Sequence, residues 1–206
     1  MSIKEGSVLL QIVDKLKNTS QEESQRNYAS TIFTLTKSLE TDVPSVEDFG
    51  KFIEDTHDLL IKGDSSKRCS VLRAVRYCLT SKDAVQLLLD REMHYAVVSS
   101  LEKDGDSAVE RMQALKIIER VQLIAPELFP VGFARSLVAV ANYKDDSFRK
   151  ICIEALRDLS LTNPSLVAAV DGFTPMMDAV LEPITQSLAD SIVLVIIYLL
   201  NDPATR

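Results

Sequence analysis

Two histidines and three cysteines are the side chains of this sequence best suited to metal binding or nucleophilic chemistry. His57 and His94 stand far apart, and neither has a second His or Cys at ligand spacing. The sequence contains no Gly-rich phosphate loop and no G-x-S-x-G nucleophile turn, and its carboxylates are scattered. We therefore expect neither an active site nor a metal or cofactor site, and we predict that the protein is not an enzyme.

The cysteines themselves favour a structural role. Cys69, Cys78 and Cys152 are odd in number and form no C-x-x-C motif. Cys78 and Cys152 fall on apolar positions of predicted helices, where reduced thiols pack as small apolar side chains. This pattern is typical of a reducing compartment, so we expect a cytoplasmic protein.

An arginine followed by apolar residues three, four, seven and ten places later recurs along the chain, and we call this pattern the Arg frame. Its clear copies begin at Arg68, Arg111 and Arg149, which stand 43 and 38 residues apart. Weaker copies begin at Arg26 and Asp190. The apolar positions of the clear copies are Val71, Leu72, Val75 and Cys78; Ala114, Leu115, Ile118 and Val121; and Cys152, Ile153, Leu156 and Leu159. The weaker copies contribute Ala29, Ser30, Phe33 and Thr36, and Val193, Leu194, Ile197 and Leu200.

A period near 40 residues is typical of armadillo and HEAT arrays, whose units bury their apolar faces against one another. The absence of Trp and the 6% aromatic content also favour a core of aliphatic residues between helices. We predict an all-α, right-handed armadillo/HEAT-like solenoid of about four to five repeats in one domain, residues 1–206. The approximate repeats are 1–40, 41–81, 82–125, 126–163 and 164–206.

Local signals place the helices within these repeats. Periodicity predicts a helix over about 21–39, and Gly63 is expected to end the following helix in a left-handed conformation. Each Arg-framed helix should be followed by one partner helix, with Pro126 and Pro164 at first helical positions. Residues Ile192–Leu200 match the helical period, although their β-branched side chains leave a buried strand as the alternative.

The recurring arginine has two interpretations. It can pair with an acidic residue of the adjacent repeat, or it can bind an acidic or phosphorylated partner. Positions five and nine after each frame start should project from the helix, away from its buried stripe. They are Arg73 and Tyr77, Lys116 and Arg120, Glu154 and Asp158, and Val195 and Leu199.

This row changes from basic to acidic to apolar along the chain. One interpretation is a solvated face without a function. The other is a groove that holds a segment of another protein, with Arg73, Tyr77, Lys116, Arg120, Glu154 and Asp158 as candidate partner-binding residues. The final apolar pair would then be a docking patch or a surface covered by a further repeat.

Net charge excludes some partner classes. The chain carries a net charge of −7 and has a pI of about 4.9, so we expect no nucleic-acid partner.

The longest apolar run, Ile192–Leu200, is shorter than the about 20 residues of a membrane-spanning helix, and the N-terminus does not resemble a signal peptide. Apolar surface at the C-terminal end predicts self-association of a fragment.

The region 68–206 resembles the N-terminal armadillo-type region of the Rictor/pianissimo family, a subunit of the second TOR kinase complex. The resemblance lies in Leu72-Arg73-Ala74-Val75-Arg76-Tyr77, Val109-Glu110-Arg111-Met112-Gln113-Ala114-Leu115, Leu128-Phe129-Pro130, Ser136-Leu137-Val138-Ala139-Val140, Asn163-Pro164-Ser165-Leu166-Val167 and Leu199-Leu200-Asn201-Asp202-Pro203-Ala204-Thr205-Arg206. It implies a non-catalytic scaffold that binds the TOR kinase and a Sin1-type subunit. Family proteins are many times longer, so we expect this chain to be a fragment, a domain or a short gene product.

Two other functions fit the same helical pattern. One is an unrelated armadillo/HEAT adaptor of the transport or chaperone type. The other is a regulator that packs on a catalytic chain. Co-purifying proteins would distinguish the three hypotheses.

Overall fold

The structure is a computed structural model that describes residues 8–18, 25–103, 107–182 and 186–201. Within these ranges every regular element is a helix, which confirms the predicted all-α class. The chain divides into two compact units, Met1–Leu128 and Phe129–Arg206. The division falls close to residue 126, where we expect the fourth repeat to begin. The hand of the array and the exact division into repeats stay predictions.

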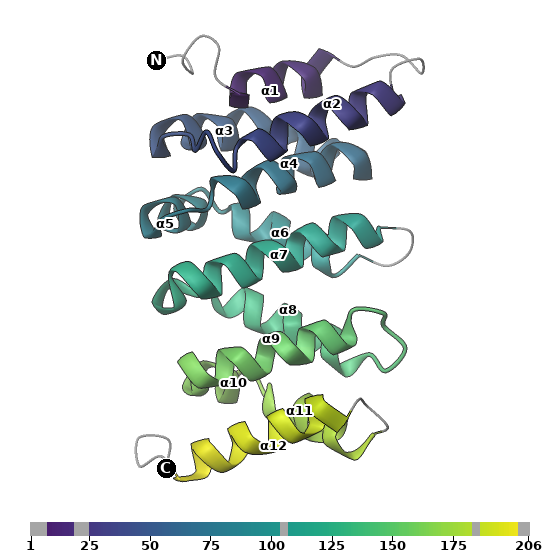
Figure 1. The fold of residues 1–206 in the computed structure, drawn as a ribbon, viewed down its shortest axis with the longest axis vertical. Coiled ribbons are helices and arrows are strands. Elements are labelled where there is room, and N and C mark those ends of the chain that lie inside the picture. The colour runs from purple at the N-terminus through teal and green to yellow at the C-terminus, as the bar shows by residue number, and fades with distance from the viewer. Residues whose placement is uncertain (1–7, 19–24, 104–106, 183–185, 202–206) are drawn as a thin grey trace. The chain divides into compact units, whose positions relative to one another are not determined.

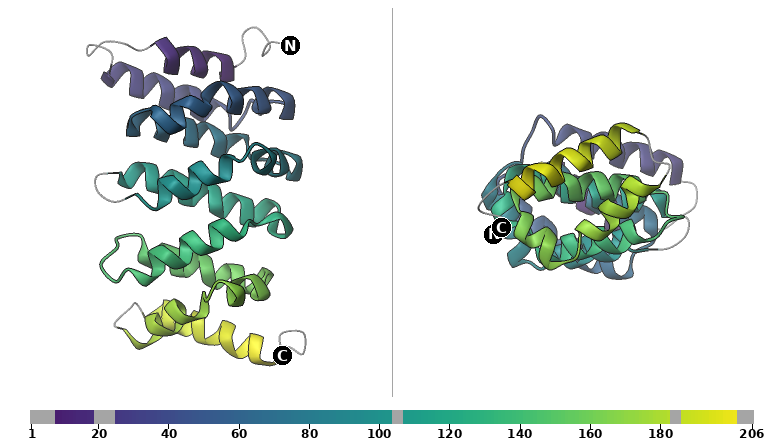
Figure 2. Two further views of the ribbon diagram at one scale, coloured as in Figure 1. Left: turned by 180° about the vertical axis from the view of Figure 1, so that it is seen from behind. Right: turned by 90° about the horizontal axis from the view of Figure 1, so that it is seen from below.

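The first unit is built from layers of antiparallel helices (Figure 1). Helix α4 packs against α2 on one side and α7 on the other, while α3 contacts α1, α4, α5 and α6. Figure 2 shows the same layers from behind. The elements are α1 (Val8–Asn18), α2 (Gln25–Ser38), α3 (Val46–Lys62), α4 (Ser65–Cys78), α5 (Lys82–Asp90), α6 (Met93–Leu101), α7 (Ala108–Ile124) and a 3-10 turn, η2 (Pro126–Leu128).

The second unit is centred on α9, which contacts all four other helices of the unit. Its helices are α8 (Val131–Asn142), α9 (Arg149–Thr162), α10 (Pro164–Ala169), α11 (Phe173–Leu181) and α12 (Gln186–Asn201). The helical assignment of α12 settles the alternative for Ile192–Leu200, which is not a strand.

The three clear copies of the Arg frame lie on α4, α7 and α9, and all twelve of their apolar side chains are buried. Full burial of one of the larger aliphatic side chains among them stabilises the fold by about 1.5–3 kcal/mol. The two predicted core thiols, Cys78 and Cys152, are among these buried groups. Burial raises the pKa of the Cys78 thiol, which keeps it neutral.

The two weaker copies of the frame are wrong in part. Phe33 is 50% exposed, although Thr36 of the same copy is buried; the side chains of 29 and 30 lie outside the described residues. In α12, Val193, Leu194, Ile197 and Leu200 are exposed, and the buried side chains are instead Leu188, Ala189, Ile192, Val195 and Leu199. Counted from position 185, the same offsets give the first four of these residues, and Leu199 follows one turn later. Because residues 192–200 of α12 are all apolar, periodicity alone does not fix which face packs inward.

Partner helices are more broken than predicted. Glu92 and Asp171 have positive φ angles of 55° and 58°, and these left-handed residues separate α5 from α6 and α10 from α11. Pro126 begins only the three-residue turn η2, and α8 starts later, at Val131. Pro164 does occupy the first turn of α10, as expected.

Side-chain caps define where several helices begin. Four capping side chains accept a hydrogen bond from the backbone N–H three residues further on: Ser45 from Asp48, Asp64 from Lys67, Ser81 from Ala84, and Asn163 from Leu166. The prediction for Gly63 is wrong, because its φ is −70° and its ψ 159°, an extended conformation. Glycine is required there for space, since a Cβ would lie 2.2 Å from the carbonyl oxygen of Leu59.

Candidate partner-binding groove

The recurring arginines have a structural role that repeats from helix to helix. Arg68 Nη1 donates to the carbonyl oxygen of Gly63, after α3. Arg111 Nε donates to Leu101 O at 2.8 Å, at the end of α6, and Arg149 Nε to Ala141 O at 2.9 Å, near the end of α8. Each arginine therefore binds a carbonyl that a helix C-terminus leaves without an internal partner.

Two of these arginines also form the predicted ion pairs with the adjacent repeat. Arg68 binds Glu110 of α7 with Nε–Oε1 at 2.8 Å and Nη2–Oε2 at 3.1 Å. Arg149 Nη1 lies 2.6 Å from Oε2 of Glu182, and Lys144 Nζ lies 2.9 Å from Oε1 of the same carboxylate. The structural interpretation of the recurring arginine is confirmed at both positions.

Glu110 is the centre of a polar cluster that ties α4, α6 and α7 together. Its fully buried carboxylate also accepts hydrogen bonds from Ser65 at 2.8 Å, Ser100 at 2.9 Å and Lys103 at 3.1 Å. Burial alone would raise the pKa of Glu110, but the hydrogen bonds, led by that from Arg68, lower it to about 2. The carboxylate is therefore charged at neutral pH and fully engaged within the fold.

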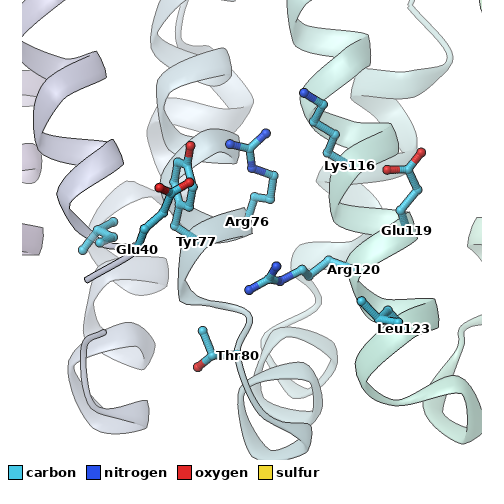
Figure 3. A pocket seen from close by; sticks show the side chains of 9 residues that line it. Glu40, Arg76, Tyr77, Thr80, Lys116, Glu119, Arg120 and Leu123 are labelled. Carbon is cyan, nitrogen blue, oxygen red and sulfur yellow. The ribbon is translucent and has the colours of Figure 1, made fainter. Parts of the chain in front are cut away.

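A cleft of about 520 Å³ opens in the first unit between the end of α2 and the facing sides of α4 and α7 (Figure 3). Three of the six predicted groove residues line it: Tyr77 on α4, and Lys116 and Arg120 on α7. The remaining lining residues are Leu39, Glu40, Arg76, Thr80, Glu119 and Leu123. The structure thus brings side chains from two successive Arg-framed helices to one site.

Positive charge exceeds negative charge in this cleft, with Arg76, Lys116 and Arg120 against Glu40 and Glu119. Arg120 Nε donates to Leu79 O at 2.8 Å, so one edge of its guanidinium is used by the fold. Arg76 lies over the Tyr77 ring, with Cζ 4.3 Å from the ring centroid. In Figure 3 the Arg120 side chain extends from α7 toward α4.

Lys116 and Arg76 have no carboxylate within ion-pair distance among the residues that the structure describes. Lys116 is exposed on α7, and Arg76 is half-buried. Their charges are therefore available to a bound group.

Arg73, the first predicted groove residue, lies one turn before Tyr77 and does not line the cleft. Its guanidinium stacks on the exposed Phe33 of α2, 5.1 Å from the ring centroid, and Nη2 lies 3.9 Å from Cys69 Sγ. Arg73 thus connects α4 to α2 and extends the basic surface beside the cleft.

Glu154 and Asp158 lie on α9 in the second unit. Glu154 is 3.9 Å from Lys150, and Asp158 is 2.6 Å from its neighbour Arg157. A continuous row that joins them to the four residues of the first unit stays a prediction.

The apolar end of the predicted row is wrong, because Val195 and Leu199 are buried. With the frame of α12 starting at 185, positions five and nine are Asp190 and Leu194, which are both exposed. The wrong prediction for Val195 and Leu199 thus arises from starting the frame of α12 at Asp190.

Sequence reasoning also missed Arg76, Thr80, Glu119 and Leu123. They stand eight or twelve residues after their frame starts. Arg76, Glu119 and Leu123 share a helix face with positions five and nine, whereas Thr80 follows the end of α4. Extending the offsets to eight and twelve would have found them from the sequence. Leu39 and Glu40 come from a different helix end and required the tertiary structure.

Within the described residues no group of three or more His, Cys, Asp or Glu side chains is arranged to hold a metal ion. The same residues include no helix with the length and hydropathy needed to cross a bilayer. The candidate site is the basic cleft between α4 and α7.

Comparison with known proteins gives one family for most of the chain. The sequence model described as "Rapamycin-insensitive companion of mTOR, N-term" matches residues 25–206. Protein pianissimo A of Dictyostelium discoideum is 39% identical over 139 residues, which are 68% of this chain and 12% of that protein. The mouse rapamycin-insensitive companion of mTOR is 30% identical over 142 residues, 68% of this chain and 8% of that protein.

A more distant relative is the target of rapamycin complex 2 subunit TSC11 of Saccharomyces cerevisiae, 26% identical over 155 residues, 75% of this chain and 11% of that protein. The chain thus spans about a tenth of the length of these relatives. Among solved structures, the crystal structure of an engineered protein aligns with a TM-score of 0.65 and 15% identity. It covers 94% of this chain and 80% of the engineered chain, and it supports the fold alone.

Proposed function

The chain belongs to the Rictor N-terminal family, and from this we propose that it is a non-catalytic scaffold region of a Rictor-like subunit in the second TOR kinase complex. Its task is to bind partner subunits, namely the TOR kinase and a Sin1-type subunit, in the cytoplasm. The observation that carries the proposal is the family match over 25–206, together with relatives whose names place them in target of rapamycin complex 2.

The arrangement of the helices supports a scaffold in a second way. The buried carboxylate of Glu110 is satisfied by hydrogen bonds within the fold. Charged groups with capacity for an outside partner, such as Arg76 and Lys116, line the basic cleft between α4 and α7. Surfaces of stacked helices of this kind are typical of repeat proteins that bind other proteins.

Affinity purification tests the proposal. A tagged copy of the chain, expressed in cells, is expected to recover the TOR kinase and a Sin1-type subunit. A chain that recovers transport receptors or chaperones instead would favour an unrelated helical adaptor and overturn the proposal.

A variant of the predicted groove provides the second readout. Joint substitution of Arg73, Lys116 and Arg120 by Ala is expected to reduce recovery of the partners while helical content, measured by circular dichroism, is retained. Unchanged recovery would show that partners bind to another face.

A further inference from the structure

We propose that the cleft between the end of α2, α4 and α7 binds an acidic segment of a partner protein, with Asp or Glu side chains on consecutive helical turns. This inference rests on the proposed function, because it assumes that the chain binds proteins. It adds the chemistry of the bound segment and the residues that recognise it.

Charge is the first argument. The chain as a whole carries −7, but the cleft holds three cations and two carboxylates. Two of those cations, Arg76 and Lys116, have no ion-pair partner among the described residues. A local positive site attracts acidic groups, whereas the rest of this acidic chain repels them, so an acidic segment is directed to the cleft.

The distribution of the charges is the second argument. Lys116 and Arg120 stand one turn apart on α7, about 6 Å along the helix axis, and Arg76 lies on the facing helix α4. A single phosphate group would need these donors to converge on one point. Carboxylates at positions i and i+4 of a helical segment are spaced by the same about 6 Å and can meet the cations one by one.

The side chain of Arg120 is held in place for this role. Its Nε is fixed by the carbonyl oxygen of Leu79 at 2.8 Å, which leaves the terminal nitrogens for a carboxylate. The guanidinium of Arg76 lies over the ring of Tyr77, and this contact restricts the Arg76 side chain as well. Less side-chain freedom is then lost when the segment binds.

Apolar surface beside the charges accommodates the rest of such a segment. Leu123, 79% exposed, lies on α7 beyond Arg120, one turn further from Lys116. A segment with an apolar residue after its acidic residues would cover it. Glu40 and Glu119 lie in the same cleft and disfavour carboxylates outside the reach of the cations.

Fluorescence anisotropy with synthetic peptides tests the inference directly. The probe is a labelled helical peptide of about 15 residues, a length at which isolated helices become populated, with Glu at i and i+4 positions. The comparison peptides carry Gln at those positions or a single phosphoserine. The Glu peptide is expected to bind the chain, the Gln peptide at least tenfold more weakly, and added salt should weaken the Glu complex.

The variant Arg76→Gln/Lys116→Gln removes two cleft cations that form no hydrogen bond with other described residues. It is expected to weaken binding of the Glu peptide by about tenfold. Lys62→Gln/Arg135→Gln removes the same charge from exposed positions outside the cleft and should bind as the unaltered chain does. Equal affinities for the two variants would overturn the inference, as would tighter binding of the phosphoserine peptide than of the Glu peptide.

The same variants separate this inference from the proposed function. If the chain binds the Glu peptide in the cleft but recovers no TOR-complex subunit, the proposed function fails and the cleft assignment holds. If Arg76→Gln/Lys116→Gln still recovers those subunits and no peptide binding is seen, the scaffold holds and the cleft assignment fails.

Discussion

Arg68 and Glu110 stand 42 positions apart and form a two-point ion pair, with Nε–Oε1 at 2.8 Å and Nη2–Oε2 at 3.1 Å. The carboxylate is fully buried, and the arginine is 16% exposed. Because Arg68 also binds the carbonyl oxygen of Gly63, one side chain joins the end of α3 to α7. The pair thus couples neighbouring layers of the first unit.

Replacing Glu110 by Gln is expected to lower the free energy of unfolding by about 3–5 kcal/mol, since Arg68 would be left partly buried without its counter-charge. Urea denaturation followed by circular dichroism measures this loss. Glu127→Gln, which removes an exposed carboxylate paired with Lys82, is the control and should lower the free energy of unfolding far less, because solvent screens an exposed ion pair. Equal losses for the two variants would contradict the role assigned to the buried pair.

Acid should weaken the fold through the same carboxylate. The folded-state pKa of Glu110, about 2, lies below its ordinary value of 4.5, so the pair stabilises the fold above about pH 4.5. This contribution, roughly 3 kcal/mol, is lost as the pH falls from 4.5 toward 2. The urea midpoints of the unaltered chain and of Glu110→Gln should therefore approach each other as the pH is lowered from about 6 to about 3. A difference between them that is independent of pH would argue against this assignment.

Arg120→Ala should lower stability by about 1 kcal/mol, because the carbonyl oxygen of Leu79 at the end of α4 loses its donor. Lys116→Ala, one turn earlier on the same face, is the matched control and is expected to stay within about 0.5 kcal/mol of the unaltered chain. Thermal and urea denaturation of both variants check this. If both substitutions are neutral, Arg120 does not cap α4 in solution.

Gly172→Ala is expected to destabilise the second unit by about 1–3 kcal/mol. An added Cβ would lie 2.7 Å from Val167 Cγ1 and 3.2 Å from Val167 O, in the turn between α10 and α11. Gly50→Ala, inside α3, meets only Leu87 Cδ2 at 3.4 Å and Cδ1 at 3.7 Å, and it should gain up to about 1 kcal/mol of helix stability. Denaturation experiments should therefore show changes in the free energy of unfolding of opposite sign for the two variants. A neutral Gly172→Ala would contradict this prediction.

The exposed face of α12 predicts self-association of the chain. Val193, Leu194, Ile197 and Leu200 are exposed there, and apolar surface of this kind favours contact with a second copy. Leu194→Asp/Ile197→Asp should shift sedimentation velocity profiles from dimer to monomer. Val109→Asp/Tyr143→Asp, which alters exposed apolar residues elsewhere, should leave the dimer intact. A chain that is monomeric at every concentration would refute this prediction.

Much of this protein was determined by local sequence. Helices and their first residues follow from periodicity and from capping side chains such as Ser45 and Asn163, because both depend on contacts within a few residues. The core positions of α4, α7 and α9 were likewise predicted, since the Arg frame repeats the same apolar offsets in each of these helices.

Only the tertiary structure decided the face on which α12 packs and the residues that meet in the cleft. Residues 192–200 of α12 are all apolar, so the buried face of this helix depends on which surface α9 and α11 present. Leu39 and Glu40 meet Lys116 and Arg120 only because α2 and α7 both pack beside α4. Periodicity describes one helix at a time, whereas a binding site between helices depends on contacts that are distant in sequence.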